Sequence, residues 1–300
     1  MERDQLYTRL QGALTAVITP MTASGDVDHA GLAENLRWMN GLGLAGYLLL
    51  GSTGEQVHLS EFERALVLEV GRRAIPDTMV LVAGTGLAGT RTTIEETRRA
   101  ANAGADVALV VTPSYYQKAM MASALTEHYR AVADASPIPV MLYSVPGVTG
   151  ITIPPEVVKA LAPHPNVVGM KNSGSDAQLA GGYRDAAGEE RFVILAGSPY
   201  AAPGFLLAGI ADGVILAVAN VAPEAGVALV QAAQAGDIEA VRRCGATLRR
   251  VADEVGRFGI AGWKAGVEAR GYHGGPARSP LRNLTADERD QLREFVRTRL

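Results

Sequence analysis

The chain has 300 residues, 48% of them hydrophobic, which is enough for one large domain or two ordinary ones. Acidic and basic residues are interspersed and sum to a net charge of −3, so no basic field attracts nucleic acid or an anionic membrane. Cys244 is the only cysteine, which excludes an intrachain disulfide. Because neither a signal peptide nor a membrane span is recognisable, we expect a cytoplasmic protein with a small-molecule partner.

Short apolar runs that end in polar or glycine turns recur along most of the chain. Each run is rich in β-branched residues and too short for a helix, so each predicts a strand buried on both faces. The eight runs are residues 13–19, 47–50, 79–83, 107–111, 140–143, 167–171, 192–196 and 214–217.

Helical patterns alternate with these runs. The second pattern opens with the capping box Ser60-Glu61-Phe62-Glu63. Eight buried strands, each followed by a helix, predict an α/β protein with a closed (β/α)8 TIM barrel; an open doubly wound sheet is the alternative. The unbroken rhythm favours the barrel. The patterns are residues 34–39, 62–73, 95–102, 124–133, 155–161 and 201–207.

No strand pattern follows Asn220. Helical patterns at 224–234, 238–255 and 285–297 make a tail longer than one barrel helix. We therefore expect a barrel over residues 1–223. The remaining residues, 224–300, are expected to form a helical extension packed on the barrel, where it caps the barrel or makes oligomer contacts.

The sixth run ends in Lys171, one of only four lysines, just before a Ser/Gly turn. An amine in apolar surroundings is disfavoured as an ammonium ion, and a free amine attacks carbonyl carbons. The structural alternative is that the stem of Lys171 packs on the strand end while its ammonium reaches water.

Two further strand ends carry polar groups that suit such a nucleophile, because active sites of these barrels lie at the carboxyl ends of the strands. Ser52 and Thr53 stand between Gly51 and Gly54 after the second run, an arrangement typical of a tight turn or of a carboxylate site. Tyr143 ends the fifth run. Its phenol can carry the protons that imine chemistry moves, tuned by the Ser52 or Thr53 hydroxyl.

Two other features receive structural interpretations. Residues 84–89 fit G-x-G-x-x-G, but they lie in the third unit and no acid ends the next run, so we interpret them as a turn. Tyr115 and Tyr116 follow the fourth run, where paired aromatic residues are typical of an interface or lid. The five histidines show no metal-binding spacing, so no metal site is predicted.

Four motifs occur in a distinctive order: Gly51-Ser52-Thr53-Gly54-Glu55, Tyr143-Ser144-Val145-Pro146, Gly169-Met170-Lys171 and Ala219-Asn220-Val221. In this order they resemble the dihydrodipicolinate synthase / N-acetylneuraminate lyase superfamily of Schiff-base (class I) pyruvate lyases. The resemblance spans nearly the whole chain. Further segments look most similar to mitochondrial-type 4-hydroxy-2-oxoglutarate aldolase, namely residues 111–116, 136–140, 142–146, 164–171, 195–198, 257–260 and 271–276.

The resemblance implies a homotetrameric barrel with a C-terminal helical extension and neither a metal nor an organic cofactor. It implies that Lys171 forms an imine with a 2-oxo acid and that Tyr143 relays protons. By the same likeness, Ser52 and Thr53 hold the pyruvyl carboxylate, and Tyr115 is the tyrosine that a neighbouring subunit contributes. The residues implied to line the pocket are Ser173, Gly197 and Ile215.

The first functional hypothesis is an aldolase that cleaves or forms a 4-hydroxy-2-oxo acid such as 4-hydroxy-2-oxoglutarate, with pyruvate and an aldehyde as its partners. Dihydrodipicolinate synthase and a sugar-acid or N-acetylneuraminate-like aldolase are the enzymatic alternatives. Val148 stands where the synthases carry an arginine for a second carboxylate, and where the aldolase tends to have asparagine, as it also does at Thr53. A 2-oxo-acid binding protein is the alternative without catalysis.

Overall fold

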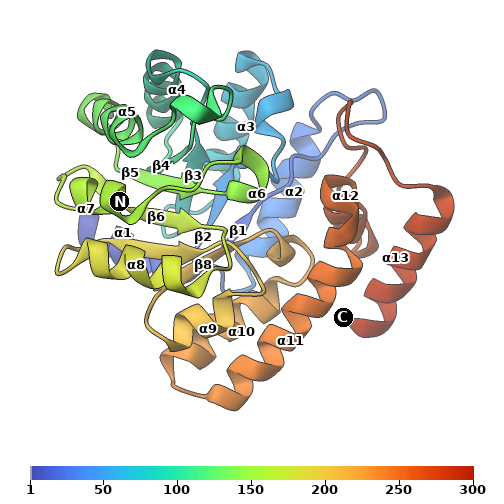
Figure 1. The fold of residues 1–300 in the computed structure, drawn as a ribbon. Coiled ribbons are helices and arrows are strands. Elements are labelled where there is room, and N and C mark those ends of the chain that lie inside the picture. Colours follow the sequence, from blue (N-terminus) through green and yellow to red (C-terminus); the bar gives the residue numbers. More distant parts are fainter. Residues whose placement is uncertain (1) are drawn as a thin grey trace.

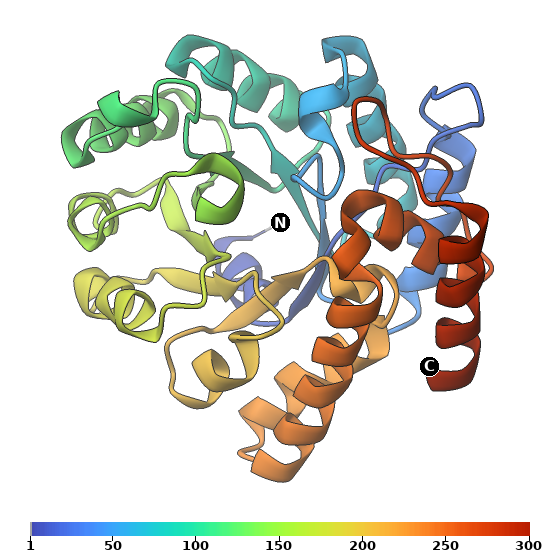
Figure 2. The ribbon, with the colours of Figure 1, turned by 45° about the vertical axis from the view of Figure 1, so that its right-hand side comes forward.

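Eight parallel strands close into a barrel in the computed structural model, which describes residues 2–300. Neighbouring strands pair in chain order, and β1 pairs with β8 to complete the ring (Figure 2). This confirms the predicted (β/α)8 barrel over the open sheet. The strands are β1 Ala13–Ala16, β2 Gly46–Leu49, β3 Val80–Gly84, β4 Val107–Val111, β5 Val140–Ser144, β6 Val167–Asn172, β7 Val193–Ala196 and β8 Gly213–Leu216.

A helix follows each strand and covers the outside of the ring (Figure 1). The predicted capping box opens α3, where the Ser60 and Glu63 side chains each bond the other residue's backbone N–H. A single turn, α6 (Pro146–Thr149), precedes α7. The ring of helices is α2 His29–Asn40, α3 Glu61–Ala74, α4 Thr90–Asn102, α5 Ala122–Ala135, α7 Pro155–Leu161, α8 Ala177–Ala187, α9 Ala202–Leu207 and α10 Pro223–Gln234.

The barrel interior is a packed apolar core. An N-terminal helix that the sequence does not predict, α1 (Arg3–Leu10), adds Leu6, Tyr7 and Leu10 to this core. Because this end is filled by side chains, a substrate pocket belongs at the opposite end, where the strands end. Inward-facing residues of the core include Leu14, Leu48, Val80, Val82, Leu109, Met141, Val168, Val193 and Leu195.

Beyond α10 the chain continues as α11 (Ile238–Glu254), α12 (Gly259–Ala269) and α13 (Ala286–Arg299). Because α10 follows β8 as the eighth helix of the ring, α11–α13 form the part of the tail beyond the barrel. The predicted division after residue 223 assigns nearly all of α10 to the extension, and it stays a prediction. Within residues 2–300, no helix has both the length and the apolar character to cross a membrane.

Asn220 joins the two strands that close the ring. Its buried side chain accepts from the Ile18 N–H at 3.1 Å and donates to the Ala16 and Ala217 carbonyls, each at 2.7 Å. This explains why the predicted strand does not continue to Thr19: the Val17 N–H still donates to the Leu48 carbonyl of β2, but the next N–H, that of Ile18, donates to the asparagine side chain.

We predict that Asn220→Ala lowers the free energy of unfolding by about 2–4 kcal/mol, because it leaves buried backbone groups without partners. Urea unfolding followed by circular dichroism measures this change. Gln234→Ala is the matched control, since Gln234 bonds only an exposed backbone carbonyl, that of Gln11. Equal losses in the two variants would contradict the role given to Asn220.

Candidate active site

Lys171 and Tyr143 face each other inside the carboxyl end of the barrel. They are register partners in the β5–β6 ladder. Both are almost fully buried, with exposed fractions of 4% and 5%. The Lys171 Nζ lies 4.4 Å from the centre of the Tyr143 ring. The structure therefore brings the predicted amine and phenol together.

The surroundings of Tyr143 favour loss of its phenolic proton. Burial by itself raises the pKa of this phenol, but the nearby Lys171 charge and hydrogen bonding with Ser173, Ser52 and Lys171 outweigh burial, so the pKa lies below its ordinary value. A phenol with a lowered pKa exchanges protons more readily near neutral pH, which suits it to general acid–base work.

The loop from Gly51 to Glu55 brings Ser52 to this phenol. Its turn is closed by a hydrogen bond from the Gly54 N–H to the Gly51 carbonyl at 3.0 Å. The Thr19 hydroxyl donates to the Gly54 carbonyl at 2.7 Å and ties the loop to the chain after β1. Ser52 is exposed at the rim and Thr53 is half-buried. Both residues thus reach the surface at the mouth of the barrel.

Two glycines of the G-x-G-x-x-G segment serve strand packing. A Cβ at Gly84 would lie 1.9 Å from the Leu50 carbonyl oxygen, and one at Gly86 would lie 2.5 Å from the Val111 nitrogen. Gly86 and Val111 also line a cavity of about 20 Å³ beside Tyr143 and Ser52. Gly84 is thus the last residue of β3, and the predicted turn is limited to residues 85–89, the loop between β3 and α4.

Gly197, which follows β7, lies against the Lys171 side chain. A Cβ here would come within 2.1 Å of the Ser173 Oγ and 2.9 Å of the Lys171 Cε. Its N–H donates to the Asn172 carbonyl at 2.7 Å, which fixes it beside β6. Ile215 is fully buried in the interior core together with Tyr143. Ser173 and Gly197 therefore border the lysine directly, while Ile215 belongs to the packing around the phenol.

Tyr115 lies outside this buried group. It is 81% exposed, and its ring packs edge-on against Tyr116 with the ring centres 4.9 Å apart. Tyr115 thus contributes nothing to the buried site of its own chain. Its predicted role requires a second copy of the chain and stays a prediction.

The sequence gives no role to a second buried lysine, Lys264 on α12. Its Nζ lies 2.5 Å from Glu55 Oε1, and both side chains are fully buried. It also donates to the Pro276 carbonyl at 2.7 Å. Because a carboxylate and a carbonyl already bind this ammonium, Lys264 is not the candidate nucleophile. The sequence does hold one sign of this buried lysine, because Lys264 stands alone in a stretch of apolar residues.

The carboxyl end of the barrel thus presents a buried amine, a phenol with a lowered pKa and hydroxyls, which are the groups that Schiff-base chemistry requires. Among residues 2–300, no group of three or more His, Cys, Asp or Glu side chains is placed to hold a metal ion.

Comparison with known proteins gives the family. Residues 9–299 match the model of the dihydrodipicolinate synthetase family, and the chain belongs to this family of carbon–carbon lyases. The chain is 37% identical over 292 residues to a 4-hydroxy-tetrahydrodipicolinate synthase of an Exiguobacterium species, covering 94% of this chain and 95% of that protein. It is 40% identical over 247 residues to the synthase of Stenotrophomonas maltophilia strain K279a, covering 82% of each.

Solved structures agree with this assignment. A chloride-inhibited dihydrodipicolinate synthase from Acinetobacter baumannii, complexed with pyruvate, has a TM-score of 0.89 and 31% sequence identity, covering 96% of this chain and 98% of that one. The synthase of Aquifex aeolicus has the same TM-score at 28% identity, covering 96% and 97%. The superfamily resemblance is confirmed, and the chain is a Schiff-base pyruvate lyase of this family.

We predict that Gly197→Ala slows imine formation with pyruvate by about tenfold or more, because the added methyl clashes first with the Ser173 hydroxyl and then with the Lys171 side chain, so that both must move. Borohydride trapping of the imine, followed over time by intact-protein mass, measures the rate. Gly181→Ala on α8 is the control, because nothing lies within 4 Å of a Cβ at that position. Equal trapping rates in the two variants would show that Gly197 makes no necessary room.

A second prediction concerns the titration of Tyr143. We expect the Tyr143 phenol to ionise at a lower pH than the other buried tyrosines. We expect Lys171→Met to raise the pKa of Tyr143, because it removes the positive charge that stabilises the phenolate. Phenolate absorbance during a pH titration measures this, with Tyr143→Phe identifying the signal. Burial raises the pKa of other phenols, so they ionise later: Tyr47, Tyr129 and Tyr183. An unchanged titration in Lys171→Met would contradict the coupling.

Proposed function

We propose that this enzyme forms an imine between the Lys171 Nζ and C2 of a pyruvyl group, and uses it to join pyruvate to an aldehyde or to reverse that reaction. The observation that carries the proposal is the 4.4 Å approach of the buried Lys171 amine to the Tyr143 ring. The similar synthase from A. baumannii was solved in complex with pyruvate, which supports a 2-oxo acid as the substrate of this enzyme.

The first half of the proposed reaction builds the imine. The unprotonated Lys171 amine adds to the ketone carbon, the nitrogen then gives up one proton while the ketone oxygen takes one up, and a neutral carbinolamine results. A second proton on that oxygen lets it leave as water while the nitrogen electron pair forms the C=N bond. Tyr143, with its lowered pKa, gives and takes these protons.

The second half makes or breaks the carbon–carbon bond. The protonated imine withdraws electrons, so C3 loses a proton and becomes the nucleophilic end of an enamine. The enamine attacks the aldehyde carbon, and the aldehyde oxygen takes up a proton to become a hydroxyl. Water then hydrolyses the imine and frees Lys171. Run backwards, the same steps cleave a 4-hydroxy-2-oxo acid to pyruvate and an aldehyde.

Other residues serve binding in this proposal. Ser52 and Thr53 donate hydrogen bonds to the pyruvyl carboxylate from a loop whose hydroxyls are accessible at the barrel mouth. Ser173, Gly197 and Ile215 line the pocket. We further propose a homotetramer in which the exposed Tyr115 of one copy completes the site of another.

For the aldehyde, the names of the relatives favour the synthase alternative. The acceptor proposed for that alternative is aspartate semialdehyde. These names give no support to 4-hydroxy-2-oxoglutarate aldolase, the first hypothesis from sequence. Val148, a neutral side chain that is 68% exposed on α6, departs both from the synthases, which carry an arginine there, and from the aldolase, which tends to have asparagine, so both activities stay in the test of the acceptor. An isopropyl group cannot grip a second carboxylate as a guanidinium does.

A substrate panel tests this proposal. We expect pyruvate to be consumed with aspartate semialdehyde, or to be released from 4-hydroxy-2-oxoglutarate or a sugar-derived 2-oxo acid. Lys171→Met should stay folded and lose at least about a thousandfold in kcat, and Tyr143→Phe about a hundredfold. Pyruvate formation or loss is followed by a coupled assay with lactate dehydrogenase.

Each result decides between hypotheses. The acceptor with the highest kcat/KM identifies the aldehyde half. Full turnover by folded Lys171→Met would reject imine catalysis. Pyruvate binding with no turnover of any acceptor would favour the 2-oxo-acid binding protein.

A further inference from the structure

Two residues at the ends of the Gly51–Glu55 loop have a disfavoured backbone conformation: Leu50, just before the loop, and Glu55, its last residue. Leu50 has a φ of 58° and Glu55 a φ of 56°, and within residues 2–300 they are the only non-glycine residues with positive φ. Side chains crowd the backbone in this region, so such residues persist only where their surroundings hold them. The loop that carries Ser52 therefore needs support from other parts of the chain.

That support comes from the C-terminal extension and reaches both carboxylate oxygens of Glu55. Lys264 of α12 lies 2.5 Å from Oε1, and the Arg278 backbone N–H donates to Oε2 at 2.8 Å. The Lys264 ammonium is also anchored to the Pro276 carbonyl. The carboxylate is thus held between α12 and the segment that follows it.

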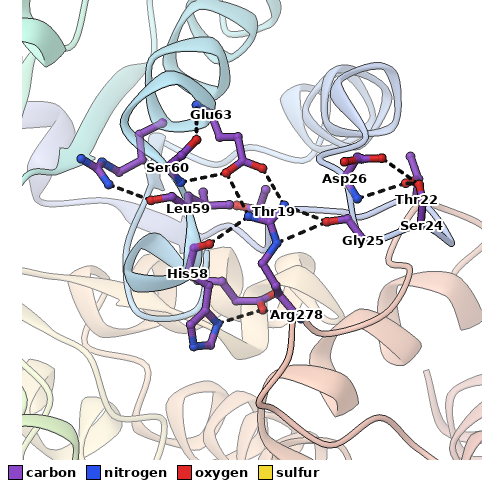
Figure 3. Close-up of polar contacts among 12 residues, drawn as sticks. Thr19, Thr22, Ser24, Gly25, Asp26, His58, Leu59, Ser60, Glu63 and Arg278 are labelled. Atoms are coloured by element: carbon purple, nitrogen blue, oxygen red, sulfur yellow. Dashed lines mark hydrogen bonds and ion pairs between the residues drawn. The ribbon is translucent and has the colours of Figure 1, made fainter.

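Arg278 fixes this segment against the barrel rim. Its guanidinium bonds both carboxylate oxygens of Glu63, at 2.6 and 3.0 Å, as Figure 3 shows. It also donates to the Gly25 carbonyl at 2.7 Å and to the His58 carbonyl at 2.9 Å. Because these partners lie on the loops after β1 and β2 and in the first turn of α3, the segment cannot shift independently of the rim.

We infer that Glu55 is a positioning residue: its buried pairing with Lys264 holds the Gly51–Glu55 loop where Ser52 meets Tyr143 and where the loop hydroxyls meet the substrate carboxylate. The part of this inference that concerns the carboxylate rests on the proposed function. The part that concerns Ser52 and Tyr143 does not.

A purely stabilising role makes a different prediction. Removing one member of a buried ion pair is strongly destabilising because it leaves a buried charge unpaired, whereas removing both charges together avoids that penalty. The double variant Glu55→Gln/Lys264→Met therefore removes the charges without leaving one unpaired. If the pair only stabilises the fold, this variant keeps normal substrate binding. If the pair positions the loop, the variant is folded but binds the carboxylate poorly.

The experiment measures the pyruvate concentration that gives half-maximal imine trapping by borohydride. We expect the double variant to raise it about tenfold relative to the wild type, with a smaller change in the maximal rate. Arg270→Met is the control, because it breaks a pair between the residue that follows α12 and Glu224 on α10, and this pair does not touch the loop. This control should keep the wild-type concentration.

Titration of Tyr143 gives a second readout that needs no substrate. The Ser52 hydroxyl helps to lower the pKa of this phenol, so a displaced loop raises it in the double variant and leaves it unchanged in Arg270→Met. A folded double variant with wild-type half-saturation and a wild-type Tyr143 pKa would overturn the inference. Failure of the wild type to form an imine, with the Tyr143 shift present, would instead reject the proposed function.

Discussion

The contact between Lys171 and Tyr143 depends on the register of β5 against β6. The ladder pairs Val140 with Val167 but Met141 with Gly169, a shift of one residue. Without this shift, Tyr143 would stand opposite Met170, whose side chain points to the other face of the sheet. The irregularity thus places both reactive groups on the inner face. The backbones of β6 and β7 also lie so close together at Gly169 that a side chain would not fit there, since a Cβ would lie 2.1 Å from the Val193 carbonyl oxygen.

The rim of the barrel and the C-terminal extension form one structural unit around this contact. Glu55 belongs to the loop that carries Ser52, yet its charged partner is on α12 and its backbone donor is Arg278. The site is therefore assembled from residues that lie at opposite ends of the sequence. This arrangement gives the extension a function beyond covering the barrel, and it explains why a fully buried ion pair lies beside a loop with strained backbone.

The apolar runs predict the strands because burial on both faces leaves a clear pattern, and strand ends then locate Lys171 and Tyr143. Helix α12 escapes prediction because Gly259, Gly262 and Gly266 are poor helix formers. In the fold these glycines permit close packing: a Cβ at Gly262 would lie 2.1 Å from the Val255 oxygen. The Lys264–Glu55 pair joins distant segments, so no local pattern reveals it. The aldehyde half of the substrate is harder still to predict, because Val148 shows only that the positive charge of an arginine is missing at that position.

Peptide mapping of the reduced pyruvate adduct tests the central claim most directly. The folded protein is incubated with pyruvate and borohydride, digested and analysed by tandem mass spectrometry. We predict that the added mass lies on Lys171 alone among the four lysines and that Lys171→Met abolishes it. An adduct on Lys264, or none on any lysine of the folded protein, would contradict this account of the site.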